Sequence, residues 1–166
     1  MSSLQTPETI SISIRDWAAL AQSEGAANVC IQLHGNSMRP LVRKERDDVT
    51  IAPLTRELKR GDVVLFQARD GRYTVHRVIH LLSGHILTQG DNCRRPDSPT
   101  PLEDVFGQVV QVKRGKLHFS IDNSFFRLCG LFWIWILPVR KFFSWLWDLL
   151  LEIKKRIFGA SNHDET

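Results

Sequence analysis

Short runs of β-branched residues, separated by turn-forming residues, fill the middle of this 166-residue chain. Val, Ile and Thr favour extended backbone, whereas Gly, Asp and Pro between such runs favour turns. Strands that follow one another so closely are typical of an antiparallel β-sandwich or a barrel-like domain, and we therefore predict a mainly β fold. We expect the strands at residues 29–33, 49–51, 63–66, 74–79, 85–88 and 105–112.

Residues 1–28 have a helical rather than a β pattern. Within residues 13–23, apolar side chains recur at helical spacing, which predicts a short helix with one apolar face. We expect residues 1–28 to be a helical extension of a domain that covers residues 29–122. The predicted apolar face consists of Ile14, Trp17, Leu20 and Ala21.

The composition changes after residue 122, where aromatic residues accumulate. The longest apolar run, residues 128–139, is shorter than the about 20 residues that span a bilayer. We therefore predict an amphipathic segment at residues 123–158, with two short helices hinged near Pro138, and a disordered tail at residues 159–166. Its aromatic side chains could insert into a membrane surface, contact a protein partner or a second copy, or pack on the β core. The candidate contact residues are four of the five tryptophans, Trp133, Trp135, Trp145 and Trp147.

The charge of the chain is modest and evenly spread. The 22 basic and 18 acidic residues give a net charge of +4, which provides no argument for a nucleic-acid partner. Cys30, Cys93 and Cys129 are odd in number and lack Cys-x-x-Cys spacing, which argues against a disulfide framework and a thiolate metal site. The N-terminus lacks the pattern of a signal peptide or membrane anchor. We therefore expect a cytoplasmic protein, free or bound to the inner face of the membrane.

Ser37 is the first residue with a candidate catalytic role. It follows the predicted strand at residues 29–33, in a loop bracketed by Gly35 and Pro40. Peptide-bond cleavage by serine needs a hydroxyl, a base within hydrogen-bond distance and donors aimed at the developing oxyanion. Ser37 supplies the hydroxyl, although a serine in such a loop is also an ordinary turn residue.

His76 is the candidate general base. Alternation along residues 74–79 places Thr74, His76 and Val78 on one face of the strand. Imidazole exchanges protons near neutral pH, although a histidine at such a position can equally be a packed, hydrogen-bonded residue. His80 would lie about 13 Å from His76 along an extended strand, too far to share one ion, and we expect neither a metal nor another cofactor.

Asp91 and Asp97 are candidate partners of the histidine. Both lie in loop sequence, where an aspartate commonly caps its own backbone. Either carboxylate could instead accept a hydrogen bond from the imidazole and fix its tautomer, the third role in a Ser-His-Asp site.

Four motifs occur in an order that resembles a known family. They are GNSMRP at residues 35–40, LKRGDVVLF at 58–66, VHRV at 75–78 and TQGDN at 88–92. Together they look like the successive boxes of type I signal peptidases and the wider clan that includes self-cleaving repressor proteases. The resemblance covers about residues 29–112 and implies a peptidase-like antiparallel β domain.

The resemblance also implies roles for individual residues. Ser37 matches the nucleophile of the family, with its own backbone N–H and that of Asn36 as oxyanion donors. His76 stands where most members have a lysine base, so the chain is similar to the endoplasmic-reticulum and archaeal type. In that type two aspartates matter, and they match Asp91 and Asp97. We favour Asp97 as the partner of His76 and Asp91 as a structural or orienting group.

These observations predict a serine endopeptidase that cleaves a precursor, leader or signal peptide through an acyl-enzyme. Because no N-terminal anchor is expected, a cytoplasmic precursor or leader peptide is the favoured substrate. The expected partners are therefore this peptide and a membrane surface or membrane protein, with no nucleic acid. The alternative is a non-catalytic adaptor with a peptidase-like fold that recruits a partner or membrane through its Trp-rich C-terminal segment.

Overall fold

The computed structural model describes residues 14–21 and 27–136, together with the single residues 138, 139, 142, 149, 150 and 152. Within these residues, eight strands form one antiparallel sheet in the order β1-β2-β7-β3-β4-β5-β6, with β8 paired to β7. The strands are β1 (Val29–Gln32), β2 (Asp47–Pro53), β3 (Val63–Gln67), β4 (Tyr73–Leu82), β5 (His85–Gln89), β6 (Thr100–Pro101), β7 (Val105–Arg114) and β8 (Leu117–Ser120), and a short 3-10 helix, η1 (Leu102–Asp104), precedes β7.

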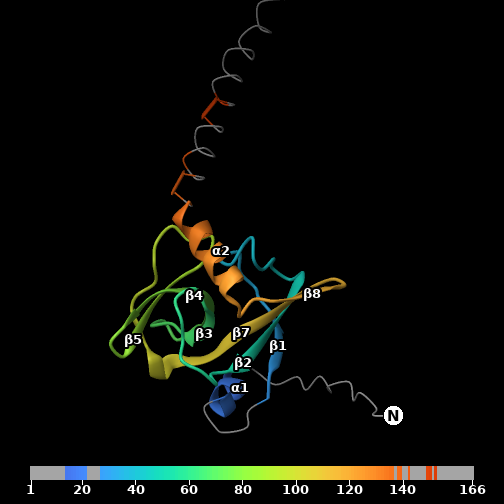
Figure 1. Cartoon of the computed structure of the whole chain (residues 1–166), viewed down its shortest axis with the longest axis vertical. Helices are drawn as coiled ribbons and strands as arrows, with labels where there is room; N and C mark the ends of the chain where they lie inside the picture. Colours follow the sequence, from blue (N-terminus) through green and yellow to red (C-terminus); the bar gives the residue numbers. More distant parts are fainter. Residues whose placement is uncertain are drawn as a thin grey trace, which may run out of the picture.

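The sheet curls into a half-barrel around its longest strands (Figure 1). β7 pairs with β2, β3 and β8 along its length. β-Bulges interrupt the β2–β7, β3–β7 and β4–β5 pairings, and a bulge bends its strand and increases the local twist. The predicted mainly β fold is confirmed, and a strand lies at each predicted position.

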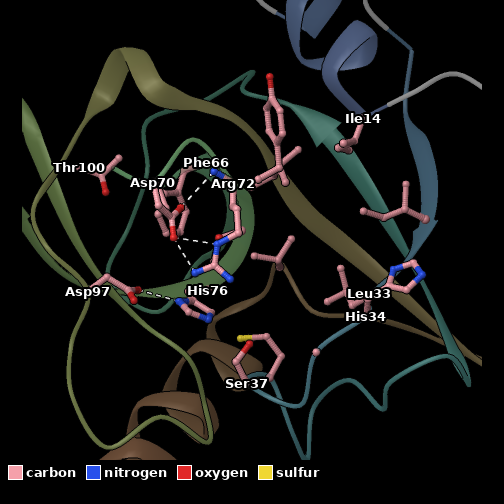
Figure 2. Close-up of a pocket in the computed structure, with 18 of the residues that line it drawn as sticks. Ile14, Leu33, His34, Ser37, Phe66, Asp70, Arg72, His76, Asp97 and Thr100 are labelled. Carbon is pink, nitrogen blue, oxygen red and sulfur yellow. Dashed lines mark hydrogen bonds and ion pairs between the residues drawn. The ribbon is translucent and has the colours of Figure 1, made fainter.

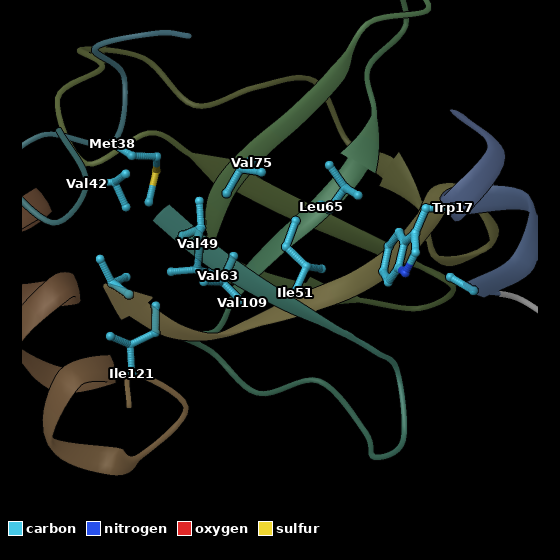
Figure 3. Close-up of a cluster of buried hydrophobic side chains, with 12 residues drawn as sticks. Trp17, Met38, Val42, Val49, Ile51, Val63, Leu65, Val75, Val109 and Ile121 are labelled. Carbon is cyan, nitrogen blue, oxygen red and sulfur yellow. The ribbon is translucent and has the colours of Figure 1, made fainter. Parts of the chain in front are cut away.

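Two apolar clusters lie on opposite faces of the sheet. Alternate residues of β3 contribute to different clusters, Leu65 to the larger one and Phe66 to the smaller one. Burial on both faces explains why the β3 sequence is a continuous apolar run. The larger cluster extends from Trp17 at one end of the sheet to Ile121 at the other (Figure 3).

α1 (Ile14–Ala21) covers one end of the larger cluster, to which Trp17 belongs. The helix is confirmed, but its predicted apolar face is wrong at one position. Leu20 is 52 % exposed, and Ala18 is buried in its place. Positions 14, 17, 18 and 21 follow the spacing of a single helical face, from which position 20 is rotated by about a third of a turn.

α2 (Ser124–Trp135) lies at the opposite end of the sheet from α1 (Figure 1). Its N-cap is Asn123, whose side chain accepts a hydrogen bond from the N–H of Phe126 (3.1 Å). Gly130 is its buried residue, and it packs directly against the guanidinium of Arg77 on β4. α2 therefore packs against the domain at Gly130, where the absence of a side chain allows the close contact with Arg77.

The C-terminal segment is described only in part. α2 ends at Trp135, and most of the second helix predicted beyond Pro138 lies outside the described residues. Trp133 is half-buried and Trp135 is exposed, whereas Trp145 and Trp147 lie outside the described residues. None of the helices in the described part of the chain is long and apolar enough to cross a membrane.

Candidate functional site

Ser37 lies in the loop that follows β1, half-buried between two fixed points. On one side, the next residue, Met38, is buried in the larger apolar cluster and its carbonyl accepts from the N–H of Val42 (2.9 Å). On the other side, the carbonyl of Ser37 accepts from the N–H of Asn92 (2.7 Å). The serine is thus fixed against both the core and the loop that follows β5.

An ion-pair cluster holds the exit of this loop. The buried carboxylate of Asp47 accepts from Arg43 (2.9 Å) and from Arg114 (2.7 Å), and Arg114 also donates to the carbonyl of Leu41 (2.9 Å). Burial alone would raise the pKa of Asp47, but the hydrogen bonds from Arg114 and Arg43 outweigh it and lower the pKa from 3.8 to about 2. The Asp47 carboxylate is therefore ionised in the folded protein at neutral pH.

His76 lies in β4 opposite Val64 of β3, on the face that the alternation predicts. Its ring is buried and lies 6.2 Å from the ring of Phe66, centroid to centroid. Nδ1 of His76 lies 2.7 Å from Oδ2 of Asp97. When the neutral ring donates its Nδ1 proton to this carboxylate, Nε2 is left with an unprotonated lone pair, which is the state that a general base requires.

Asp97 is itself held in place by Thr88. The hydroxyl of Thr88 donates to Oδ2 of Asp97 (2.7 Å), and the Asp97 N–H donates to the carbonyl of Thr88 (2.8 Å). Thr88 is fully buried in β5. The carboxylate oxygen that faces the histidine therefore has a second, fixed donor, which sequence reasoning did not identify because Thr88 reads as an ordinary strand residue.

Gly90 lies where the histidine and the serine loop meet. A methyl group added at its Cα would lie 3.0 Å from Nε2 of His76, 2.8 Å from the carbonyl oxygen of Ser37 and 2.7 Å from Sγ of Cys93. These atoms therefore lie close together around Gly90, and their packing leaves no room for a side chain at this position. Within residues 27–136 no hydrogen bond joins the Ser37 hydroxyl to His76, an arrangement seen in free enzymes whose catalytic hydrogen bonds tighten when substrate binds.

No hydrogen bond or ion pair joins Asp91 to His76 among the described residues. Its carboxylate forms a bidentate ion pair with Arg77, with Nε–Oδ1 and Nη2–Oδ2 both at 2.8 Å. The remaining nitrogen of Arg77 donates to the carbonyl of Gly61 (2.8 Å). Asp91 thus fixes the loop after β5 to β4, which fits the structural role expected for it.

The expected oxyanion donors lie on the open side of the loop. A methyl group added at Gly35 would have the N and Oγ of Ser37 as its nearest neighbours, both at 3.9 Å. No acceptor within residues 27–136 takes the N–H of Ser37. Asn36 contributes to the loop through its carbonyl, which accepts from the N–H of Arg39 (3.2 Å).

A cavity of about 1030 Å³ connects these residues (Figure 2). Ser37, His76 and Asp97 lie along one part of it, with His76 drawn between the other two. Asp70 and Arg72 form an ion pair at another part of the wall, from the turn between β3 and β4. Apolar side chains line most of the remainder, among them Ile31, Leu33, Met38, Leu65, Tyr73 and Val75.

No known family model and no curated protein matches this chain. The resemblance carried by the four motifs therefore stays a prediction. A function for the chain has to follow from the chemistry and geometry of the described residues.

Proposed function

We propose that the protein is a serine endopeptidase that cleaves a precursor, leader or signal peptide through an acyl-enzyme. The observation that carries the proposal is that Ser37, His76 and Asp97 line one cavity. Nδ1 of His76 is bound to Asp97, and Nε2 lies near Gly90, where the loop after β5 meets the loop that contains Ser37. A histidine that was merely packed would not need a carboxylate on one ring nitrogen in a position where the ring also lines a cavity.

In the proposed reaction, Nε2 of His76 takes the proton of the Ser37 hydroxyl as Oγ attacks the peptide carbonyl. A C–O bond forms, and the carbonyl oxygen becomes an oxyanion that the Ser37 N–H stabilises. The imidazolium then protonates the leaving amine, the C–N bond breaks and an acyl-enzyme remains. Water, deprotonated by the same histidine, hydrolyses the ester and restores the serine. Asp97 stabilises the imidazolium in both steps.

The cavity supports an extended peptide as substrate. β1 lies at the end of the sheet order and pairs with β2, so within the described chain its other edge is open to a further strand. Ile31 and Leu33 lead from this edge along the cavity toward Ser37. A peptide added beside β1 would gain backbone hydrogen bonds and place alternate side chains in the apolar part of the cavity.

We place this activity in the cytoplasm or at the inner face of a membrane. Cys30, Cys93 and Cys129 all lie among the described residues and no disulfide joins them, which fits a reducing compartment. A leader or precursor peptide made in the cytoplasm would then be the substrate.

A second candidate is the non-catalytic adaptor. It is favoured by one observation, the exposed aromatic side chains of α2 at the end of an otherwise compact domain. An adaptor, however, would not require Ser37 and His76 to share a cavity.

Cleavage of a complex peptide mixture, prepared from a digested proteome and read by mass spectrometry, distinguishes the two candidates without a known substrate. The wild type should produce new peptide termini, and Ser37→Ala should reduce their rate of formation by at least about 10³-fold. Ser83→Ala, an exposed serine in the turn between β4 and β5, is the matched control and should cleave normally. Equal cleavage by wild type and Ser37→Ala would exclude the proposed nucleophile.

A further inference from the structure

α2 has a continuous apolar face that the domain leaves uncovered. Phe125, Leu128, Phe132 and Trp135 are each between 60 % and 76 % exposed. Their spacing of three, four and three residues places them on one side of the helix. Three of the four are aromatic, so the face is large as well as apolar.

The opposite side of α2 is firmly fitted to the domain. Phe126 packs against the larger apolar cluster, and Arg127 donates to Asp62 (3.3 Å). Gly130 packs against Arg77 so closely that any side chain there would overlap the guanidinium. These contacts fix the rotation of the helix about its axis, and they direct the apolar face outward.

The sequence continues the same spacing beyond α2. Val139, Phe142, Leu146 and Leu149 follow at intervals of four, three, four and three residues from Trp135. Those that the structure describes, Val139, Phe142 and Leu149, are 40 % to 56 % exposed. Residues 137–158 contain two acidic and five basic residues, the latter being Arg140, Lys141, Lys154, Lys155 and Arg156.

We propose that this apolar face, defined by Phe125, Leu128, Phe132 and Trp135, docks the protein onto an anionic lipid surface. Phe and Trp side chains are suited to the boundary between headgroups and acyl chains, and nearby basic residues are attracted to anionic headgroups. The basic residues that follow α2 in the sequence would likewise be attracted to a negative lipid surface.

A second copy of the chain is the main competing occupant. Helix seams between copies favour Leu, Ile and Val at the recurring positions, whereas Phe and Trp occupy three of the four exposed positions here. Helices from two copies would have to pair along a continuous seam. Pro138 interrupts that seam, because proline removes a backbone donor and crowds the preceding turn. The composition therefore favours lipid over a paired helix.

Lipid docking through α2 would hold the candidate site at the membrane in a fixed orientation. Gly130 contacts Arg77, and Arg77 is the residue after His76 in β4. A peptide at the membrane surface would then reach a candidate site that α2 holds close to the lipid. The docking itself does not depend on Ser37 or His76, so it can be measured independently of any cleavage.

Co-sedimentation of the full-length protein with lipid vesicles tests the proposal. Vesicles of phosphatidylcholine mixed with phosphatidylglycerol should carry the wild type into the pellet, and vesicles of phosphatidylcholine alone or high salt should reduce the bound fraction. The double variant Leu128→Gln/Phe132→Gln should lower the partition coefficient by at least about tenfold. The matched control is Leu82→Gln/Leu117→Gln, which removes two leucines that are at least half exposed and lie outside α2, and it should bind as the wild type does.

Phe125→Gln/Trp135→Gln provides a second variant of the same face, and thermal unfolding should show that both α2 variants fold, because the replaced side chains are exposed. Retention of the wild type in the supernatant with both vesicle types would overturn the proposal. Equal loss of binding in the α2 and control variants would do so as well. A concentration-dependent dimer in sedimentation velocity without lipid, abolished by the α2 variants and accompanied by no vesicle binding, would assign the face to a second copy instead.

Discussion

Two adjacent residues of β4 each bind an aspartate from the loop that follows β5, yet the two pairs are built differently. His76 binds Asp97 through one hydrogen bond of 2.7 Å, whereas Arg77 binds Asp91 through two of 2.8 Å. Their side chains lie on opposite faces of the strand, as alternation requires. The first pair faces the cavity, and the second faces Gly130 of α2.

The difference lies in what each pair leaves open. Arg77 and Asp91 are both 2 % exposed, and the carbonyl of Gly61 accepts a hydrogen bond from the third guanidinium nitrogen of Arg77. By contrast, the side chain of Asp97 is 29 % exposed, and both His76 and Asp97 line the cavity. The Arg77–Asp91 pair is thus enclosed in the protein, whereas the His76–Asp97 pair borders a space that a reacting group could enter. The comparison separates an ion pair that supports the loop from a pair that can do chemistry.

The largest expected effect is the loss of activity in Asp97→Asn. An amide in place of the carboxylate favours the wrong tautomer of His76 and cannot stabilise the imidazolium, so kcat should fall by about 10⁴-fold while the melting temperature changes little. Steady-state cleavage of a peptide found in the mixture experiment measures it. Asp70→Asn, at the cavity wall but away from His76, is the control and should retain most activity. Near-normal kcat in Asp97→Asn would remove the distinction between the two pairs.

Asp91→Ala should instead act on stability. It leaves the guanidinium of Arg77 buried without its counter-charge, which costs about 3–5 kcal/mol in free energy of unfolding. Urea unfolding followed by Trp fluorescence measures the change. If Asp91→Ala unfolded at the wild-type urea concentration and lost only activity, Asp91 rather than Asp97 would be the better candidate for the catalytic partner.

Asp47→Asn extends the comparison to the ion pair at the exit of the serine loop. Because the native pKa of Asp47 is lowered to about 2, its ionisation stabilises the fold above pH 4 and this contribution is lost as the pH falls through about 2. The variant should therefore be about 2 kcal/mol less stable than the wild type at pH 7, and the difference should shrink toward pH 2. A pH-independent difference would show that the charge is not the cause.

Thr88→Val should give the smallest effect. It removes one donor to the Asp97 carboxylate while keeping the shape of the buried side chain, which should lower kcat about tenfold and leave KM unchanged. Thr88→Ser restores the hydroxyl and should recover most of the rate. If the serine and valine variants were equally impaired, Thr88 would act through packing and not through Asp97.

Much of the fold follows from local patterns in the sequence. The β-branched runs predicted β1, β2, β3, β4, β5 and β7 because residue type and its alternation along the chain are local properties of the sequence. β6 and β8 were missed because both are short: β6 has two residues, one of them Pro101, and β8 has four residues, none of them β-branched. Leu20 was wrongly placed on the buried face because Leu20 and Ala18 are both apolar. They differ in size, so polarity alone did not show which of the two faces the core.

The candidate site was predictable as a set of residues and, through the resemblance, as a preference for Asp97 over Asp91 beside His76. The residues alone left the two aspartates open, because both lie in loop sequence and their distances to His76 depend on how that loop folds against β4. The contact between Arg77 and Gly130 could not be read from sequence, because it joins residues far apart in the chain whose only signal is an arginine in an apolar run. Position in space, rather than residue type, separates Asp91 from Asp97.

The most direct test of the central claim is covalent labelling of Ser37 by a fluorophosphonate, located by mass spectrometry. An activated serine attacks the phosphorus, displaces fluoride and becomes phosphonylated, so the adduct marks the nucleophile without a known substrate. We predict a single adduct on Ser37, formed at least about 100-fold more slowly in His76→Ala and absent from Ser37→Ala. An adduct that forms equally fast without His76, or that lies on another serine, would contradict the account.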